Sequence, residues 1–245
     1  MKNQVETLAW DSSFFGYKVG KCDLSSATGE EIRFLLASPE INDYRLVYFF
    51  LNRGDSTLEF MLESFPELKF VDTKRVYERK ILTSDETIVS SGRCLSKGNE
   101  FLRQLEGLAL ESGLYSRFHT DVNFVNKEFE RLYLEWIKQS LNREIAHEVF
   151  VSIDHDRVQG FVSLARKKFE AEIGLIAVDQ EIRAGGIGSD LVCHAIKKAW
   201  EWNCLSIRVA TQKANKTACR FYEKHGFSLH REINIYHMWN MNKRD

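Results

Sequence analysis

The chain lacks the features that mark several large classes of protein. Its 245 residues hold 34 Lys and Arg against 35 Asp and Glu, a formal net charge of -1, whereas a nucleic-acid surface needs a pronounced basic excess. No window approaches the ~18 apolar residues of a membrane span. The first residues, Met1 to Glu6, lack the apolar core of a signal peptide. We therefore expect a soluble cytoplasmic protein with no nucleic-acid or membrane partner.

Cysteine is also scarce and scattered. The chain has five, at Cys22, Cys94, Cys193, Cys204 and Cys219. Their number is odd and no two have Cys-x-x-Cys spacing, so the pattern indicates neither a disulfide framework nor a zinc site. We expect no metal. Internal repeats and low-complexity segments are not apparent either.

The composition is that of a globular protein. Hydrophobic residues make up 44% of the chain, enough to bury a core, and the length fits one large domain or two small ones. Up to about residue 85 the pattern predicts a small α/β unit. Its expected strands lie at 19–24, 45–52 and 70–82, and its expected helices at 28–38 and 58–65.

A polar stretch over residues 83–97, punctuated by Ser and Gly, is typical of a domain boundary. We predict an auxiliary N-terminal α/β domain over residues 1–90 and a second domain over 91–245. In the second domain the pattern predicts helices over 99–112 and 127–142, a hairpin (149–153 and 158–165) and a long antiparallel strand (169–178). A helix from 187 to about 202, a strand, another helix and two terminal strands are expected to follow.

The segment from Gly174 to Ser189 is the most informative part of the chain. An apolar strand leads into Arg183, then into a glycine cluster, then into a helix that begins near Ile187. This order directs backbone N–H groups and a helix N-terminus at one point, which suits phosphate oxygens. Glycine tolerates positive φ and lets a ligand approach the backbone. We interpret the loop as the binding site for the pyrophosphate of a coenzyme A thioester.

The spacing Arg183-x-x-Gly186-x-Gly188 resembles the signature of the GCN5-related N-acetyltransferases (GNAT). A second segment, Asn215 through Tyr222 to Gly226-Phe227, resembles that family's second motif. Alone, the glycine cluster also fits a dinucleotide or methyl-donor loop, or a tight turn. A dinucleotide fingerprint, however, is Gly-x-Gly-x-x-Gly early in a βαβ unit with an acidic residue ~20 positions on, which this chain does not show. The resemblance implies a mixed, mostly antiparallel sheet flanked by helices.

Other segments resemble one branch of the family, the dTDP-fucosamine (dTDP-4-amino-4,6-dideoxygalactose) acetyltransferases of bacterial surface-polysaccharide synthesis. The opening Trp10-x-x-x-Phe14-Phe15-Gly16 is similar to that of their auxiliary domain. Further likeness lies at Ser116 to Phe118, Glu135 to Ile137, Gly160 to Leu164 and Arg208 to Gln212. The Gly226-Phe227 ending and a somewhat greater length depart from this branch, which leaves open a different amino sugar or a larger acyl group.

The family resemblance implies a set of residues that bind the acyl-CoA. They are Leu175, Ile176, Ala177, Val178, Arg183, Ala184, Gly185, Gly186, Ile187, Gly188, Ser189, Asn215, Ala218 and Tyr222. Freed N–H groups at Leu175–Val178 would bind the oxyanion of the tetrahedral intermediate. Tyr222 would be the general acid, because a phenol is protonated at neutral pH and can donate to a thiolate.

Each of these residues also has a plainer interpretation. Tyr222 could be a core aromatic like Phe221, and Asn215 could cap the helix that follows it. Arg183 could be a solvated loop charge, Ser189 a first-turn residue, and Ala218 a small residue that leaves room.

The general base and the sugar contacts are less well defined by the sequence. Glu172, on the strand before the loop, and His119 and Asp121, after Ser116-Arg117-Phe118, are candidate bases, although each also fits a surface polar residue. Arg117 and Phe118 are candidate sugar-nucleotide contacts, because a guanidinium binds phosphate oxygens bidentately; burial of Arg117 against Tyr133 or Trp136 is the alternative. The aromatic residues Phe14 and Phe15 could stack on thymine or lie in the core.

The sequence thus predicts an N-acyltransferase that moves an acetyl or small acyl group, such as 3-hydroxybutyryl, from coenzyme A to the amine of a dTDP-linked 3- or 4-amino-dideoxy sugar. Acetylation of a protein N-terminus or small polyamine is an alternative, and a non-catalytic acyl-CoA-binding module is another. A homodimer is common among relatives of the family.

Overall fold

The computed structural model describes residues 4–52, 54, 56–89, 93–94, 101–183 and 185–240. Its contacts divide the chain into two compact units. Unit 1 comprises residues 1–75, 212–214 and 231–245, and unit 2 comprises 76–211 and 215–230. Two long strands, β4 (Lys69–Lys80) and β10 (Ser228–Trp239), contribute residues to both. The predicted domain division at residues 90 and 91 stays a prediction.

Unit 1 is a small α/β layer. Strands β1 (Glu6–Thr7), β2 (Val19–Asp23) and β3 (Leu46–Asn52) follow one another in the sheet, and β10 comes next to β3. β2 and β3 run parallel and are joined through α2 (Gly29–Ala37) and a 3-10 turn (Pro39–Asp43), while β3 and β10 are antiparallel. The remaining helices are α1 (Ala9–Phe15) and α3 (Ser56–Leu62).

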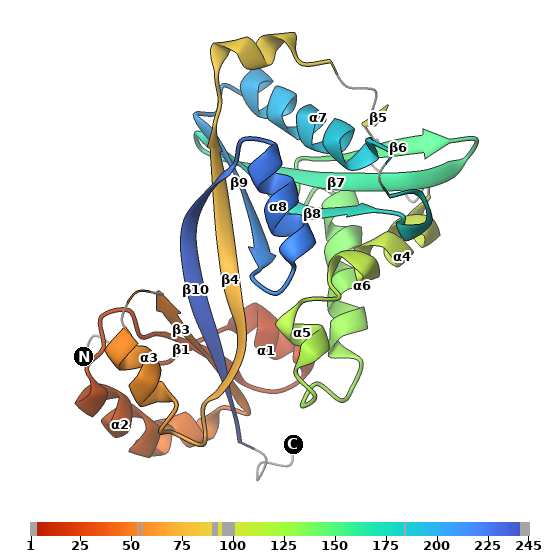
Figure 1. Cartoon of the computed structure of the whole chain (residues 1–245). Coiled ribbons are helices and arrows are strands. Elements are labelled where there is room, and N and C mark those ends of the chain that lie inside the picture. Colours follow the sequence, from red (N-terminus) through yellow and green to blue (C-terminus); the bar gives the residue numbers. More distant parts are fainter. Residues whose placement is uncertain are drawn as a thin grey trace. The chain divides into compact units, whose positions relative to one another are not determined.

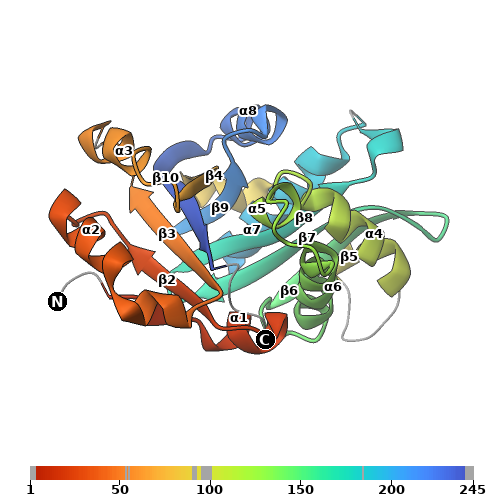
Figure 2. The same ribbon diagram turned by 90° about the horizontal axis from the view of Figure 1, so that it is seen from below.

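An apolar cluster of described residues stabilises unit 1. Side chains of α2 and α3 pack on β2, β3 and β10, with Phe49, Ile32 and Leu62 almost wholly buried; Figure 2 shows α2 and α3 beside these strands. Helix α2 begins with a capping box between Thr28 and Glu31, which satisfies backbone donors that a helix start otherwise leaves unpaired. The near-helical spacing predicted this helix correctly.

Unit 2 has a mixed sheet with the strand order β4-β9-β8-β7-β6-β5. The remaining strands are β5 (Arg93–Cys94), β6 (Glu148–Asp154), β7 (Arg157–Lys167), β8 (Glu170–Val178) and β9 (Ser206–Gln212). β5 to β8 pair antiparallel in succession, and β8 pairs parallel with β9. The predicted hairpin and the long strand before the loop are both present.

Helices cover both faces of this sheet (Figure 1). One face carries α7 (Ile187–Glu201) and α8 (Lys216–Lys224), and the other carries α4 (Leu102–Ser112) and α6 (Glu128–Leu141). Shorter pieces are α5 (Arg117–Thr120) and 3-10 turns at Thr83–Thr87 and Gln180–Ile182. The predicted α/β class, with a mixed and mostly antiparallel sheet flanked by helices, is confirmed.

One prediction about the fold is wrong. Two terminal strands were expected after the last helix, but a single 12-residue strand, β10, occupies residues 228–239. The segment contains neither Gly nor Pro, the residues that most strongly favour turns. The chain therefore continues as one strand from Ser228 to Trp239.

Candidate functional site

The end of β8 separates from its neighbour β9. Parallel pairing between the two strands ends at Ile173 and Val209, whereas pairing of β8 with β7 continues to Val178. Figure 1 shows β8 and β9 heading apart. The last residues of β8 therefore offer backbone groups on the side that β9 has left.

The direction of these backbone groups follows from the ladder with β7. The N–H of Asp179 donates to the carbonyl of Gln159 at 2.9 Å. Because N–H groups alternate in direction along a strand, Ala177 faces β7, and the N–H groups of Ile176 and Val178 face the open side. The N–H of Leu175 is bound to the hydroxyl of Ser163 at 2.8 Å. Of the four residues predicted to hold an oxyanion, the geometry favours Ile176 and Val178.

The glycine cluster forms the predicted turn into α7. Gly186 is the N-cap and has φ 85° in the left-handed region, a conformation that glycine adopts at low cost. As a glycine, this N-cap has no side chain that could bond the N–H groups of Ile187, Gly188 and Ser189, and within the described residues this leaves them for other acceptors. An anion fits such a helix start, because donors and the helix dipole act together.

Gly188 is small because α8 packs closely against the start of α7. A Cβ built on Gly188 would stand 3.3 Å from the ring of Phe221. Residues from the end of β8, the start of α7 and α8 lie in one apolar cluster: Ile176, Val178, Ile187, Ala218, Phe221 and Tyr222. The structure thus brings the three predicted parts of the acyl-CoA site together within unit 2.

Arg183 lies on the exposed approach to this loop. Its Nε donates to the Val178 carbonyl at 3.1 Å, and its Nη2 lies 3.1 Å from a carboxylate oxygen of Glu111 on α4. More than half of its side chain is accessible, 57%. The guanidinium is therefore held beside the glycine turn yet open to a ligand. Ala184, also predicted to bind coenzyme A, lies outside the described residues.

Helix α8 carries the second motif. Asn215 is its N-cap, and its side-chain oxygen accepts from the Ala218 N–H at 3.0 Å. This bond confirms the capping role and leaves the side-chain nitrogen of Asn215 for a ligand. Contact between Asn215 and pantetheine stays a prediction.

Tyr222 is buried, with 4% of its surface exposed, among the rings of Tyr77, Phe221 and Phe227. Burial, and secondarily the neighbouring Cys219, raises the pKa of the Tyr222 phenol well above its usual value. The group is thus a protonated donor at neutral pH, and its role as the acid stays a prediction.

The three candidate bases have other partners within unit 2. Glu172 on β8 forms an ion pair with Lys167. The Nδ1 of exposed His119 donates to the Leu114 carbonyl at 2.9 Å, since a carbonyl only accepts, which leaves Nε2 with a lone pair. Asp121 ends α5 and accepts from the backbone and side chain of Asn123. The role of general base stays a prediction for all three residues.

The predicted sugar contacts lie in both units. In unit 2, Phe118 is buried against the rings of Phe124 and Trp136, and the Arg117 guanidinium lies 4.3 Å from the centre of the Phe118 ring. In unit 1, Phe15 is buried, while half-buried Phe14 stacks on Trp10 with ring centres 4.9 Å apart. Core packing accounts for Phe15 and Phe118, and sugar contact by any of the four stays a prediction.

Ser163 was not among the predicted site residues. It lies on β7, with 1% of its surface exposed, and accepts from the β8 backbone at Leu175. A signal was present in the sequence: a lone serine in the apolar run Gly160 to Leu164, where a buried hydroxyl needs a hydrogen-bond partner. The identity of that partner depends on the strand register, which the run alone does not give.

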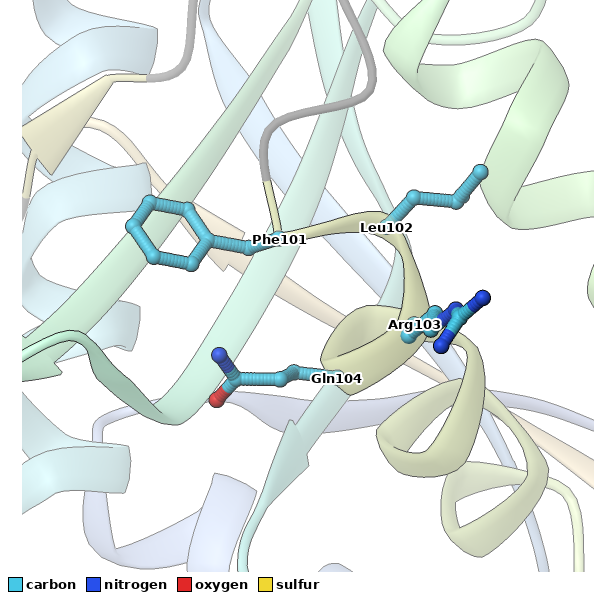
Figure 3. A pocket seen from close by; sticks show the side chains of 4 residues that line it. All are labelled: Phe101, Leu102, Arg103 and Gln104. Atoms are coloured by element: carbon cyan, nitrogen blue, oxygen red, sulfur yellow. The ribbon is translucent and has the colours of Figure 1, made fainter.

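A hollow of about 460 Å³ opens at the first turn of α4 (Figure 3). It is lined by Phe101, Leu102, Arg103 and Gln104, none of which is a predicted site residue.

Within the described part of the chain, no group of three His, Cys, Asp or Glu side chains could hold a metal ion. No helix in that part is long and apolar enough to cross a membrane.

Comparison with known proteins gives matches over parts of the chain. Residues 113–227 match the model of the acetyltransferase (GNAT) family. The spore coat polysaccharide biosynthesis protein SpsD of Bacillus subtilis is 25% identical over 132 residues, 54% of this chain and 45% of that protein. Human N-alpha-acetyltransferase 30 is 35% identical over 66 residues, 27% of this chain and 18% of that protein. The chain spans less than half the length of these relatives.

The similarity to solved structures extends over more of the chain than the similarity to these relatives. A GCN5-related N-acetyltransferase from Sphaerobacter thermophilus has a TM-score of 0.64 at 13% identity, over 96% of this chain and 76% of that one. A tandem GNAT protein from the clavulanic acid biosynthesis pathway has a TM-score of 0.59 at 11% identity, over 93% and 76%. At these identities the likeness shows the fold alone. The chain has the α/β GNAT fold, and its residues 113–227 match the GNAT acetyltransferase family.

Proposed function

We propose that the protein is an acyl-CoA-dependent N-acyltransferase acting on a dTDP-linked 3- or 4-amino-dideoxy sugar. The observation that carries the transferase activity is the junction of β8 and α7. Strand β8 leaves β9 after Ile173, and the chain then turns at Gly186 into a helix whose N-cap, a glycine, has no side chain to bond the first N–H groups. A long ligand with a diphosphate and an amide-bearing arm suits donors arranged in this way.

Different residues of the chain would bind the acyl-CoA, accept the proton of the amine and protonate the leaving thiolate. N–H groups of Ile187 to Ser189, with Arg183, would hold the diphosphate, and those of Ile176 and Val178 would face the arm and the thioester carbonyl. The amine nitrogen attacks that carbonyl, the carbon–sulfur bond breaks, and the amine gives its proton to a base. His119 is the favoured base, acting directly or through one water. Tyr222 donates its proton to the departing thiolate.

The choice of an amino sugar depends on the sequence resemblance and on one relative. SpsD, whose name places it in spore coat polysaccharide biosynthesis, matches 54% of this chain. The opening Trp10 to Gly16, which forms helix α1 and its left-handed end at Gly16, resembles that of the dTDP-fucosamine acetyltransferases. These observations support a sugar-linked amine as the acceptor and an acetyl or short hydroxyacyl group as the cargo.

A second candidate is acetylation of a protein N-terminus. Human N-alpha-acetyltransferase 30 shares 35% identity over 66 residues, a higher identity over a shorter stretch. The two candidates use the same acyl-CoA site and differ in the acceptor alone.

The deciding experiment is mass spectrometry of products from a matched panel. The purified chain is incubated with acetyl-CoA or 3-hydroxybutyryl-CoA and with dTDP-4-amino-4,6-dideoxygalactose, its 3-amino isomer, a peptide with a free N-terminus, or spermidine. We expect an N-acylated dTDP-sugar. Acylated peptide or spermidine without acylated sugar would move the assignment to the second class of acceptor. Binding of acetyl-CoA with no product from any acceptor would favour a non-catalytic module.

A further inference from the structure

Strand β8 contains a bulge where it passes Ser163 of β7. Leu164 pairs with Ile173, yet Val162 pairs with Ile176, so the two residues Gly174 and Leu175 stand opposite Ser163 alone. An extra residue in one strand leaves a backbone group without its ladder partner. At this bulge the unpaired group is the Leu175 N–H, and it donates to the Ser163 hydroxyl at 2.8 Å.

The bulge and the serine fit each other closely. Ser163 is 1% exposed, so its hydroxyl has little access to water. A Cβ built on Gly174 would stand 3.0 Å from the Ser163 oxygen, closer than ordinary van der Waals contact. Glycine at 174 therefore leaves the space that the hydroxyl occupies. At this bulge the Ser163 side chain therefore replaces the missing hydrogen bond between the strands, and Gly174 leaves room for it.

The bulge changes the phase of every residue after it. Before it, Ala171 and Ile173 belong to the apolar cluster beneath α7; after it, the partly buried members of that cluster are Ile176 and Val178. Leu175 and Ala177 instead pack in the cluster beneath α4 and α6. Because side chains alternate along a strand, a regular β8 would direct 175 and 177 toward α7. The direction of the backbone N–H groups shifts with them.

We infer that the Ser163 hydroxyl is a positioning group, which fixes the bulge so that the Ile176 and Val178 N–H groups face the open side of β8. This inference rests on the proposed acyl-CoA site at that side. Ser163 itself does not face the ligand. It acts through Leu175, and the two N–H groups beyond the bulge would contact the arm and thioester carbonyl of the acyl-CoA.

The test is a comparison of backbone amide signals in the full chain and in Ser163→Ala. Nitrogen-15-labelled protein is titrated with acetyl-CoA and followed by NMR. In the native chain we expect shifts at Ile176 and Val178 and at Gly186 to Ser189. In Ser163→Ala we expect the loop shifts to persist and the two strand shifts to vanish. Exchange of the Leu175 amide with deuterium should become about tenfold faster, because its acceptor is gone.

Two further variants complete the design. Ser152→Ala on β6 removes a hydroxyl that donates to Gln159 at 3.1 Å, outside the bulge, and should leave all these signals unchanged. Gly174→Ala crowds the Ser163 oxygen from the other strand and should also abolish the shifts at Ile176 and Val178. This second route tests the inference even where Ser163→Ala fails to fold.

The outcomes separate the two proposals. Strand shifts that survive in both Ser163→Ala and Gly174→Ala would overturn the positioning role while leaving the acyl-CoA site intact. A native chain that responds to acetyl-CoA at neither the loop nor the strand would overturn the proposed function. Loss of strand shifts in both variants, with the loop response kept, supports the inference.

Discussion

At the residue scale, the proposed chemistry depends on the buried phenol of Tyr222. We expect Tyr222→Phe to lower kcat by about 100-fold or more, in line with general acid catalysis. The ring and its packing against Tyr77 and Phe227 are kept, so binding of coenzyme A and the melting temperature should stay near native values. Tyr77→Phe is the matched control. It removes a hydrogen bond to Glu223 and should cost about 1 kcal/mol of stability with little effect on kcat. An unchanged kcat in Tyr222→Phe would exclude the acid role.

Arg183 gives a second prediction at this scale. Charge-assisted hydrogen bonds to phosphate contribute about 1.5–3 kcal/mol, so Arg183→Gln should raise the Kd for acetyl-CoA by roughly tenfold or more. The variant also removes the ion-pair partner of Glu111. The unpaired carboxylate would then repel the diphosphate and raise the Kd further. Isothermal titration calorimetry measures the change. Arg143→Gln, at an exposed arginine that donates to the His147 carbonyl, is the control, and equal Kd values in the two variants would contradict the assignment.

Single residues were predictable where their role follows from their own chemistry. The glycine cluster was expected to form a turn that tolerates positive φ, and Gly186 has φ 85°; Asn215 was recognised as a helix cap as well as a ligand contact, and the cap is present. Ser163 was missed, because its partner at Leu175 is twelve residues away and depends on a register shift. The direction of Ile176 and Val178 was likewise unreadable, since one extra residue reverses the phase of a strand.

At the scale of elements, the start of α7 combines stability with binding. Gly186→Ala places a Cβ on a backbone with φ 85°, a left-handed conformation that costs about 1–2 kcal/mol for other residues. We expect a lower free energy of unfolding in urea and weaker binding of acetyl-CoA. Gly107→Ala in α4 is the matched opposite, because that site is open and alanine favours a helix by about 1 kcal/mol. An unchanged free energy of unfolding in Gly186→Ala would show that the left-handed backbone at this position is not strained by a side chain.

Whole elements were predicted well where one sequence pattern dominates. The helices at 29–37, 128–141 and 187–201 were each expected within about two residues, because apolar spacing and caps act locally. The error at β10 has the opposite origin. Two strands were expected there, although residues 228–239 contain neither Gly nor Pro. The parallel pairing of β2 with β3 could not be read from either strand alone.

At the scale of the whole molecule, acid should destabilise unit 2 through Asp85. Burial alone would raise the pKa of this carboxyl, but hydrogen bonds from Arg79 and the Leu82 N–H, with the charge of Arg79, hold it below its usual value. A lowered folded pKa contributes stability above the unfolded value of ~4, and that stability is lost as pH falls through the folded pKa. We expect the free energy of unfolding to drop below about pH 4 and the drop to be smaller in Asp85→Asn. Equal acid sensitivity in urea titrations would contradict this.

Each of the two units is built from segments that are not consecutive in the chain. A cut at the predicted domain boundary would therefore lower the stability of the fragment that remains. A fragment of residues 91–245 would keep β10 without β3, whose pairing runs from Ile233 with Asn52 to Trp239 with Leu46. It would expose Tyr236 and Met238, now buried, and burial of each such side chain contributes about 1.5–3 kcal/mol.

Tyr77, which is buried beside Tyr222 in the core of unit 2, would also be missing from this fragment. These losses approach the ~5–15 kcal/mol that stabilise a typical domain. We therefore expect the fragment to lack a cooperative thermal transition, as measured by calorimetry against the full chain. A sharp transition together with native-like binding of acetyl-CoA would show instead that residues 91–245 fold as an independent domain, because the core of unit 2 would then hold without β4.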